Sequence, residues 1–182
     1  MIDLIIPTVS QGLLWALMAL GVYITFRVLD IADLSVEGTF PLGAAVASTA
    51  LTAGLGTVPA FLLAAVAGAL AGIVTALLTT KLKIPALLAG ILTMIGLYSV
   101  NLHVMGKANI SLLRVDTVFS LVRDWGVTDA VATFIVGLAA VLLVGVAIYW
   151  FFGTELGTAI RATGFNPQMA RAQGISTDTM VV

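Results

Sequence analysis

Hydrophobic residues run along this chain in long, nearly uninterrupted stretches, with charges and turn residues between them. A helix needs about 20 mostly apolar residues to cross the hydrocarbon core of a bilayer. We therefore predict an all-α fold, a polytopic membrane helix bundle that forms a single domain over residues 1–182. The predicted transmembrane helices, about five, cover residues 4–26, 38–55, 59–80, 85–105 and 129–152.

The second stretch differs from the others, because it is short, rich in small residues and opens with glycine and proline at Gly38 and Pro41. Three carboxylates, Asp30, Asp33 and Glu37, precede or open it. We predict a buried or broken helix, in which residues 35–41 form a discontinuous start that lines a pathway at depth, as in transporters. The alternative is a solvated loop at the membrane edge. The candidate pathway residues here are Asp33, Ser35, Glu37 and Thr39.

Composition supports a membrane location. The chain is 60% hydrophobic and 9% charged, its mean hydropathy is +1.15, and a soluble domain has about 25% charged residues. These values exclude a soluble globular domain. The chain has no cysteine, so disulfides and thiolate metal sites are excluded, and its net charge of −1 predicts no nucleic-acid partner. We expect no cofactor.

Lysine and arginine are unevenly divided between the two sides of the predicted bundle, and the richer side is expected to be cytoplasmic. This places the N-terminus outside, with residues 27–37, 81–84 and the tail after Gly153 inside. Residues 106–128 are then external, with amphipathic pieces at 111–115 and 119–122 on the interface. The cytoplasmic side collects Arg27, Lys81, Lys83, Arg161 and Arg171, and the other side collects Lys107, Arg114 and Arg123.

Small residues recur at helical spacing in two spans. Gly68 and Gly72 lie four apart in the third span, and Gly137 and Gly145 share a face of the fifth. Because lipid tails provide no hydrophobic force between helices, small residues mark faces where helix backbones approach closely. We predict intramolecular packing at these faces, with a dimer seam as the alternative.

The fourth span ends with two polar residues, Asn101 and His103. Two positions apart on a helix, they point about 200° away from each other and cannot form one site. With one histidine and no cysteine, the ligand count is too low for a zinc site, so no metal is predicted. We place both residues near the outer interface, with Asn101 as a further candidate for pathway lining.

The tail contains two helix-start signals. Thr154 can cap a helix that ends at Gly164 in a left-handed conformation, and Asn166 can cap a second short helix with Pro167 at its first position and Gly174 just past its end. A solvated loop does not require two capped helices that meet at an elbow. We predict an element that docks into a groove of another protein.

Two motifs carry a family resemblance. Residues 12–23, the segment Ile31-Ala32-Asp33-Leu34-Ser35-Val36-Glu37-Gly38 and the later residues 157–166, with Ala170 and Gly174-Ile175, resemble the permease subunits of bacterial ABC importers. Among them, the chain is similar to the branched-chain amino acid and ribose permease family. The Asp-Leu-Ser-Val-Glu-Gly form is closest to its amino-acid branch, which includes tryptophan and tyrosine importers. The resemblance covers essentially the whole chain.

The resemblance implies a subunit in the bacterial inner membrane that moves a small solute, an amino acid by this branch, and is not itself an enzyme. Its implied partners are a second permease copy in a homodimer, ABC ATPase subunits and an extracytoplasmic solute-binding protein. Residues 154–174 would be the cytoplasmic coupling element that enters a cleft on the ATPase. The residues assigned to coupling are Glu155, Gly157, Arg161, Ala162, Gly164, Phe165, Asn166, Pro167, Ala170, Arg171 and Gly174.

Members of this family continue with further spans after the coupling element, so we expect the chain to be truncated, with residues 177–182 beginning another span. Two other classes remain. A fragment of an ion-coupled secondary transporter should carry ionisable residues in mid-span, and none is found there. An intramembrane enzyme needs paired catalytic groups, whereas His103 has no acid or nucleophile at a productive spacing.

Overall fold

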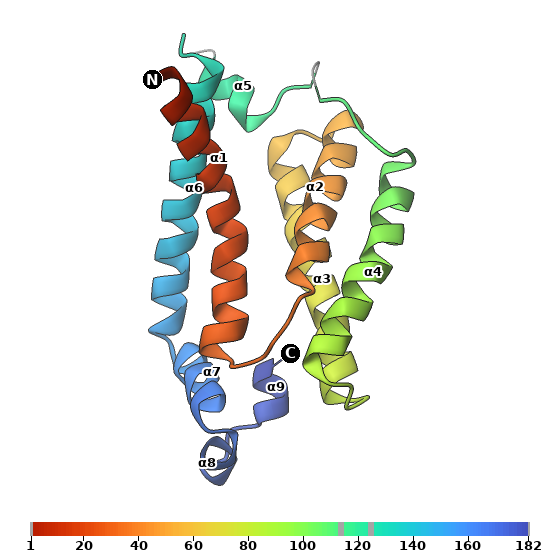
Figure 1. The fold of residues 1–182 in the computed structure, drawn as a ribbon, viewed down its shortest axis with the longest axis vertical. Helices are drawn as coiled ribbons and strands as arrows, with labels where there is room; N and C mark the ends of the chain where they lie inside the picture. The colour runs from red at the N-terminus through yellow and green to blue at the C-terminus, as the bar shows by residue number, and fades with distance from the viewer. Residues whose placement is uncertain (1, 113–114, 124–125, 182) are drawn as a thin grey trace.

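The computed structural model of the chain describes residues 2–112, 115–123 and 126–181, and every regular element among them is a helix. The chain runs up and down between two ends of a bundle (Figure 1). The elements are α1 (Ile2–Tyr23), a π-helix η1 (Ile24–Val28), α2 (Val36–Thr52), α3 (Thr57–Thr80), α4 (Ala86–Met105), α5 (Val118–Arg123), α6 (Asp129–Phe152), α7 (Glu155–Phe165), α8 (Pro167–Ala172) and α9 (Thr177–Val181).

Four helical stretches among the described residues are long and apolar enough to cross a membrane. They are Ile5–Val28, Thr57–Thr80, Ala86–Met105 and Asp129–Phe152. The remaining long helix, α2, has 17 residues and packs lengthwise against α3 and α4 (Figure 1). The predicted all-helical bundle is confirmed, and its second helix is shorter than the length of about 20 residues that a perpendicular span requires.

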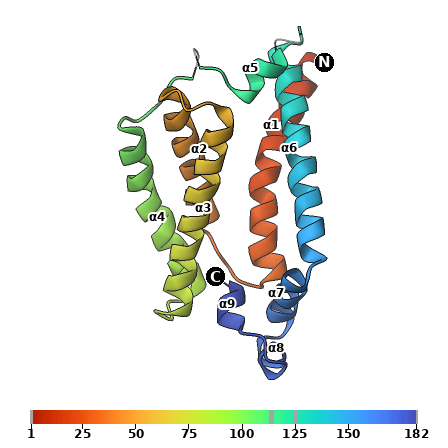
Figure 2. The same ribbon diagram turned by 180° about the vertical axis from the view of Figure 1, so that it is seen from behind.

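The helices form two groups, and both views show them side by side (Figures 1 and 2). In the first group, α1 packs against α6. There the hydroxyl of Ser10, a buried residue, donates to the carbonyl of Ile6 in α1 at 2.6 Å and lies 3.3 Å from the carbonyl of Ala130 in α6. In the second group, α2, α3 and α4 pack on one another, and Thr75 of α3 donates a hydrogen bond of 2.9 Å to the hydroxyl of Thr93 on α4. Among the described residues, neither group contains a core of large buried side chains.

Small residues make the contacts between helices, and large apolar side chains point outward. Where the structure describes the chain, the buried hydrophobic residues are alanines and Leu42, whereas Leu143 and Val146 on α6 are 71% and 68% exposed. A water-soluble protein shows the reverse distribution. Close backbone approach through small residues, with bulky residues facing outward, is the arrangement that lipid favours.

The glycine faces fulfil the sequence prediction only in part. A Cβ on Gly137 would lie 3.2 Å from Cβ of Leu13, so this glycine does let α6 approach α1. Gly68, Gly72 and Gly145 would meet nothing within 4 Å. For these three, close packing against a neighbouring helix is wrong within the described residues, because an added Cβ would meet open space; Gly72 and Gly145 line cavities instead.

The two ends of the bundle separate the described lysines and arginines as predicted; Arg114 lies outside the described residues. Figure 1 shows the N-terminus and α5 at one end, and α7, α8 and α9 at the other, which we call the tail end. The connections 29–35 and 81–85 also lie at the tail end. Of the amphipathic pieces, 119–122 falls within α5, Ser111, Leu112 and Val115 lie outside any helix, and residues 113–114 are outside the described residues. Which end faces the cytoplasm stays a prediction.

Replacing Gly137 by valine should destabilise the fold, because the new side chain would press on Leu13. We expect a loss of about 1–3 kcal/mol in the free energy of unfolding. The matched control is Gly145→Val in the same helix, where the Cβ meets open space; both variants carry the same change in helix propensity. Thermal unfolding in detergent measures the difference, and equal melting temperatures for the two variants would contradict the packing.

Candidate functional site

The connection between α1 and α2, residues 29–35, climbs back into the bundle (Figure 1); we call it the connector. It leaves η1 with the amide of Leu29 bonded to the carbonyl of Ile24 at 3.1 Å, five residues back. Asp30 follows with φ at 55°, a left-handed conformation that aspartate tolerates. A Cβ on Gly21 would lie 3.8 Å from Val36, the first residue of α2. Gly21 is seven residues before the end of η1, so α2 begins roughly 10 Å inside the tail end.

Asp33 organises the start of α2. Its two carboxylate oxygens accept the amide of Ser35 at 2.8 Å and the hydroxyl of Ser35 at 2.9 Å. A carboxylate that receives an amide two residues on is a common device for starting a helix, and its charge favours the positive end of the helix dipole. Ser35 is buried, and Asp33 is half-buried. Both candidates therefore have local structural partners.

The connector fits against α4 because residue 90 is glycine. A Cβ on Gly90 would lie 2.7 Å from the amide nitrogen of Leu34 and 2.8 Å from a carboxylate oxygen of Asp33. Gly38, one turn later, is held in the same way, because its Cβ would lie 2.9 Å from Cα of Met94. The backbones of the connector and α2 thus touch the backbone of α4 directly.

Glu37 and Asn101, two candidates from different spans, line one cavity of about 360 Å³, which we call the α2–α4 cavity. Asn101 is 7% exposed, and its side-chain oxygen Oδ1 has no hydrogen-bond partner among the described residues. The other lining residues are Gly38, Pro41, Met94, Ile95 and Tyr98. His103, by contrast, is exposed, as the predicted divergence of the two side chains requires.

The other pathway candidates lie elsewhere. Asp33 lines a second cavity of about 190 Å³, with Thr25 of η1 and Thr75 of α3 among its other walls. The hydroxyl of Thr39 donates within α2 to the carbonyl of Val36 at 3.3 Å. The structure thus brings together Glu37 and Asn101 and separates them from the other three.

The predicted break in the second helix is wrong. α2 runs without interruption from Val36 to Thr52 and contains Gly38 and Pro41. Proline removes only the bond to the carbonyl four residues earlier, and for Pro41 that carbonyl belongs to Glu37, in the first turn. Gly38 serves close packing against Met94 instead of a bend. The start of α2 lies inside the bundle because the connector runs back into the bundle before the helix begins.

In the tail, both predicted helix caps are confirmed. The amide of Gly157 donates to the hydroxyl of Thr154 at 3.3 Å, and the amide of Met169 donates to the side chain of Asn166 at 3.0 Å. Pro167 is the first residue of α8. Gly174 follows the helix with φ at 85°, and the amide of Gly174 bonds to the carbonyl of Arg171 at 3.0 Å.

The predicted left-handed conformation of Gly164 is wrong. Gly164 lies inside α7, and φ is positive at Gly174 instead. The need for glycine has another cause: a Cβ at position 164 would overlap the carbonyl oxygen of Val28 and lie 2.9 Å from Cα of Leu29. α7 therefore rests directly on the end of η1 and the start of the connector. Gly157 has the same role against Phe151 and Phe152, where α6 meets α7.

Two arginines assigned to coupling tie the tail together. Arg161 donates to the carbonyl of Phe152 at 2.7 Å and so caps the end of α6. Arg171 donates to the hydroxyl of Thr177 at 2.7 Å and lies 3.7 Å from a carboxylate oxygen of Asp178. With Ala170 buried at 3% exposure, α8 is held to α9, and these residues stiffen the element.

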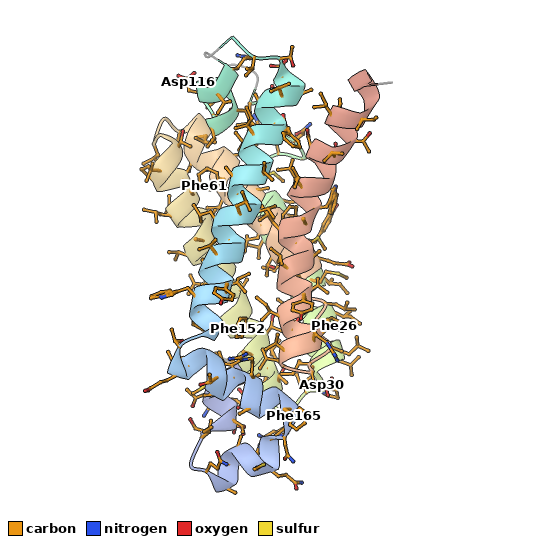
Figure 3. The ribbon with its side chains drawn as sticks, turned by 90° about the vertical axis from the view of Figure 1, so that its left-hand side faces the viewer. Phe26, Asp30, Phe61, Asp116, Phe152 and Phe165 are labelled. Atoms are coloured by element: carbon orange, nitrogen blue, oxygen red, sulfur yellow. The ribbon has the colours of Figure 1, made fainter. Side chains whose placement is uncertain are left out.

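Other coupling candidates face outward. Phe165 is 93% exposed, and Met169, which the sequence prediction missed, is 59% exposed. Phe165 lies at the lower end of the molecule in Figure 3, beyond Phe152 at the end of α6. Glu155, Ala162, Asn166 and Pro167 are also exposed. A signal for Met169 was present, since it is the one large apolar residue of the short helix that Asn166 caps.

Comparison with known proteins gives a consistent set of relatives. Residues 4–182 match the family model described as the permease component of branched-chain amino acid transport systems. The tyrosine transport system permease protein of Clostridioides difficile is 38% identical over 172 residues, which cover 94% of this chain and 56% of that protein. The autoinducer 2 import system permease protein LsrC of Yersinia pseudotuberculosis is 32% identical over 180 residues, covering 94% and 47%. No solved structure matches. The chain spans about half the length of the curated relatives it matches.

Gly164→Val should loosen the tail from the bundle, because the new side chain would collide with the backbone of Val28 and Leu29. We expect the free energy of unfolding to fall by about 1–3 kcal/mol or more, because main-chain atoms cannot move aside as easily as side chains do. Hydrogen exchange of the amides of α7 and η1 should accelerate. The control is Ala162→Val, at an exposed position of the same helix. Equal exchange in both variants would show that α7 does not depend on this contact.

Proposed function

Because the chain belongs to the family of permease components of branched-chain amino acid transport systems, we propose that it is the membrane-spanning permease subunit of an ATP-binding cassette importer. Its solute is a small molecule, an amino acid by the match to a tyrosine transport permease. It works as a multi-pass protein of the bacterial inner membrane, with a second permease copy, ATPase subunits at the tail end and an extracytoplasmic solute-binding protein at the other. ATP hydrolysis takes place in the partner subunits.

The observation that carries this proposal is the exposed apolar pair Phe165 and Met169 on an internally tied tail. The tail follows the last residue of the span α6, so these side chains lie past the apolar spans. Large apolar side chains exposed outside the spans indicate a protein partner. Two short helices with capped ends, presenting such residues at their elbow, fit the helix-in-groove mode of recognition. The groove is assigned to the ATPase.

The coupling residues divide into two roles. One group shapes the element and holds it to the bundle: Gly157, Arg161, Gly164, Ala170, Arg171 and Gly174. The other group forms the face presented to the ATPase: Glu155, Ala162, Phe165, Asn166, Pro167 and, in addition, Met169. This division is supported by the hydrogen bonds of the two arginines and by the exposure of Phe165 and Met169.

Movement of the element reaches the pathway through backbone contacts. α7 rests on Val28 and Leu29, and the connector that starts there ends at Asp33 and Ser35, where α2 begins. A shift of α7 therefore displaces the start of α2 and the walls of both cavities. Alternating access needs two packings of similar free energy that ATP and solute bias in opposite directions. The proposed pathway residues are Asp33, Ser35, Glu37, Thr39 and Asn101.

An ion-coupled secondary transporter is the second candidate, and the structure offers it little support. Its coupling ion requires ionisable residues near the middle of the spans. The four candidate spans carry no Asp, Glu, Lys or Arg in their middle. Glu37 of the shorter helix α2, whose neighbour Gly38 touches Met94 of α4, is the carboxylate that this candidate would use. Uptake driven by an ion gradient in the absence of ATP would favour this candidate.

Changing both Phe165 and Met169 to alanine should weaken the ATPase complex. Buried apolar anchors at interfaces are each worth about 2 kcal/mol or more, so we expect at least a tenfold loss of recovered ATPase. The measurement is co-purification in detergent of the intact tagged protein from its own host, with identification and assay of the ATPase recovered.

The control is Phe61→Ala, a phenylalanine that is 59% exposed on α3, near the opposite end of the bundle (Figure 3). This variant should recover as much ATPase as the unmodified protein. Equal losses in both variants would point to general destabilisation. Full recovery with the Phe165 and Met169 double variant would remove this face from the interface.

A further inference from the structure

The α2–α4 cavity has both polar and apolar residues in its lining. Glu37, Tyr98 and Asn101 carry the polar groups, and the other lining residues are Gly38, Pro41, Met94 and Ile95. A volume of about 360 Å³ is within the range of small-molecule sites, roughly 300–1,000 Å³. Apolar walls with a few placed polar groups are typical of such sites.

The spacing of the two polar ends follows from the packing of the helices. Gly38, next to Glu37, touches α4 at Met94. Asn101 is seven residues further along α4, which corresponds to roughly 10 Å at 1.5 Å per residue. An extended molecule with two polar groups can span this separation.

Both ends accept hydrogen bonds. Glu37 presents a carboxylate, and Pro41, four residues later, has no N–H to donate to the carbonyl of Glu37. Among the described residues no ion pair involves Glu37. At the other end, the buried Oδ1 of Asn101 has no donor among the residues that the structure describes. A buried acceptor without a partner is costly, and a ligand that donates to it recovers that cost.

We propose that this cavity is a solute subsite that recognises a primary ammonium group at Glu37 and a hydrogen-bond donor at Asn101, joined by an apolar body. This inference rests on the proposed transport function and names the chemistry of its solute. The charged carboxylate selects the cationic end, because a charge-assisted hydrogen bond is about twice as strong as a neutral one. Asn101 selects solutes with a hydroxyl or N–H at the far end.

Two simpler explanations predict different behaviour. Glu37 stands in the first turn of α2, where any acidic side chain favours the helix dipole. In that case its charge would affect stability and leave binding unchanged. The Oδ1 of Asn101 could instead pair with a second copy of the chain, in which case removing it would weaken that association. The experiment separates these outcomes.

The test measures binding of three probes of similar size to the intact purified protein. Tyramine has an amine and a hydroxyl, 2-phenylethylamine has only the amine, and 4-ethylphenol has only the hydroxyl. We expect tyramine to bind most tightly. Glu37→Gln should weaken both amines about tenfold or more and leave 4-ethylphenol unchanged. Asn101→Leu should abolish the preference for tyramine over 2-phenylethylamine without lowering the melting temperature.

The control variant is Asp129→Asn, which removes an acidic side chain from the first turn of α6, outside the cavity. It should not change the affinity for any probe. Unchanged amine affinity in Glu37→Gln overturns the subsite, as does an Asn101→Leu variant that keeps the preference but associates less with its second copy. If the ATPase still co-purifies while no probe binds, the subsite alone fails. If the probes bind and no ATPase is recovered, the importer assignment fails instead.

Discussion

Backbone-to-backbone contact at glycine holds the connector between α1 and α2 in place. Gly164 of α7 lies against Val28 and Leu29, and Gly90 of α4 lies against Asp33 and Leu34. At each place a methyl group would overlap main-chain atoms, which unlike a flexible side chain cannot turn aside. The connector is thus clamped between two helices that are far apart in sequence. Inside lipid, where no hydrophobic force joins helices, such close approach is the available source of tight association.

The clamp places the start of α2 inside the bundle. Because the connector climbs along α4, α2 reaches the N-terminal end within 17 residues, and its first turn lies beside Met94 instead of at the beginning of α4. This offset brings Glu37 to the α2–α4 cavity. It also makes the tail and the cavity mechanically dependent on each other, since the segment that supports one also supports the other. The connector supports both the tail and the walls of the cavity. This arrangement suits a pathway that opens when the tail moves.

Local chemistry was predictable from sequence, and long-range contact was not. The spans follow from runs of apolar residues, and the caps at Thr154 and Asn166 follow from side chains that act on amides three residues away. The conformation of Gly164 was mispredicted, because a glycine near a helix end has two explanations, a left-handed turn or a close contact. Only the position of Val28, more than 130 residues earlier, decides between them.

The candidate pathway shows the same division. Gly38 and Pro41 suggested a broken helix because both residues disturb a helix on their own, but the packing on Met94 uses the glycine and the first turn absorbs the proline. That Glu37 and Asn101 line one cavity depends on the register of α2 against α4, which nothing in either span encodes locally. Exposure needs the same spatial context: Phe61 and Phe165 are both exposed, yet the first belongs to an apolar span and the second to a short helix outside the spans. One exposed phenylalanine therefore indicates lipid and the other indicates a protein partner, because the surroundings of a side chain determine what its exposure means.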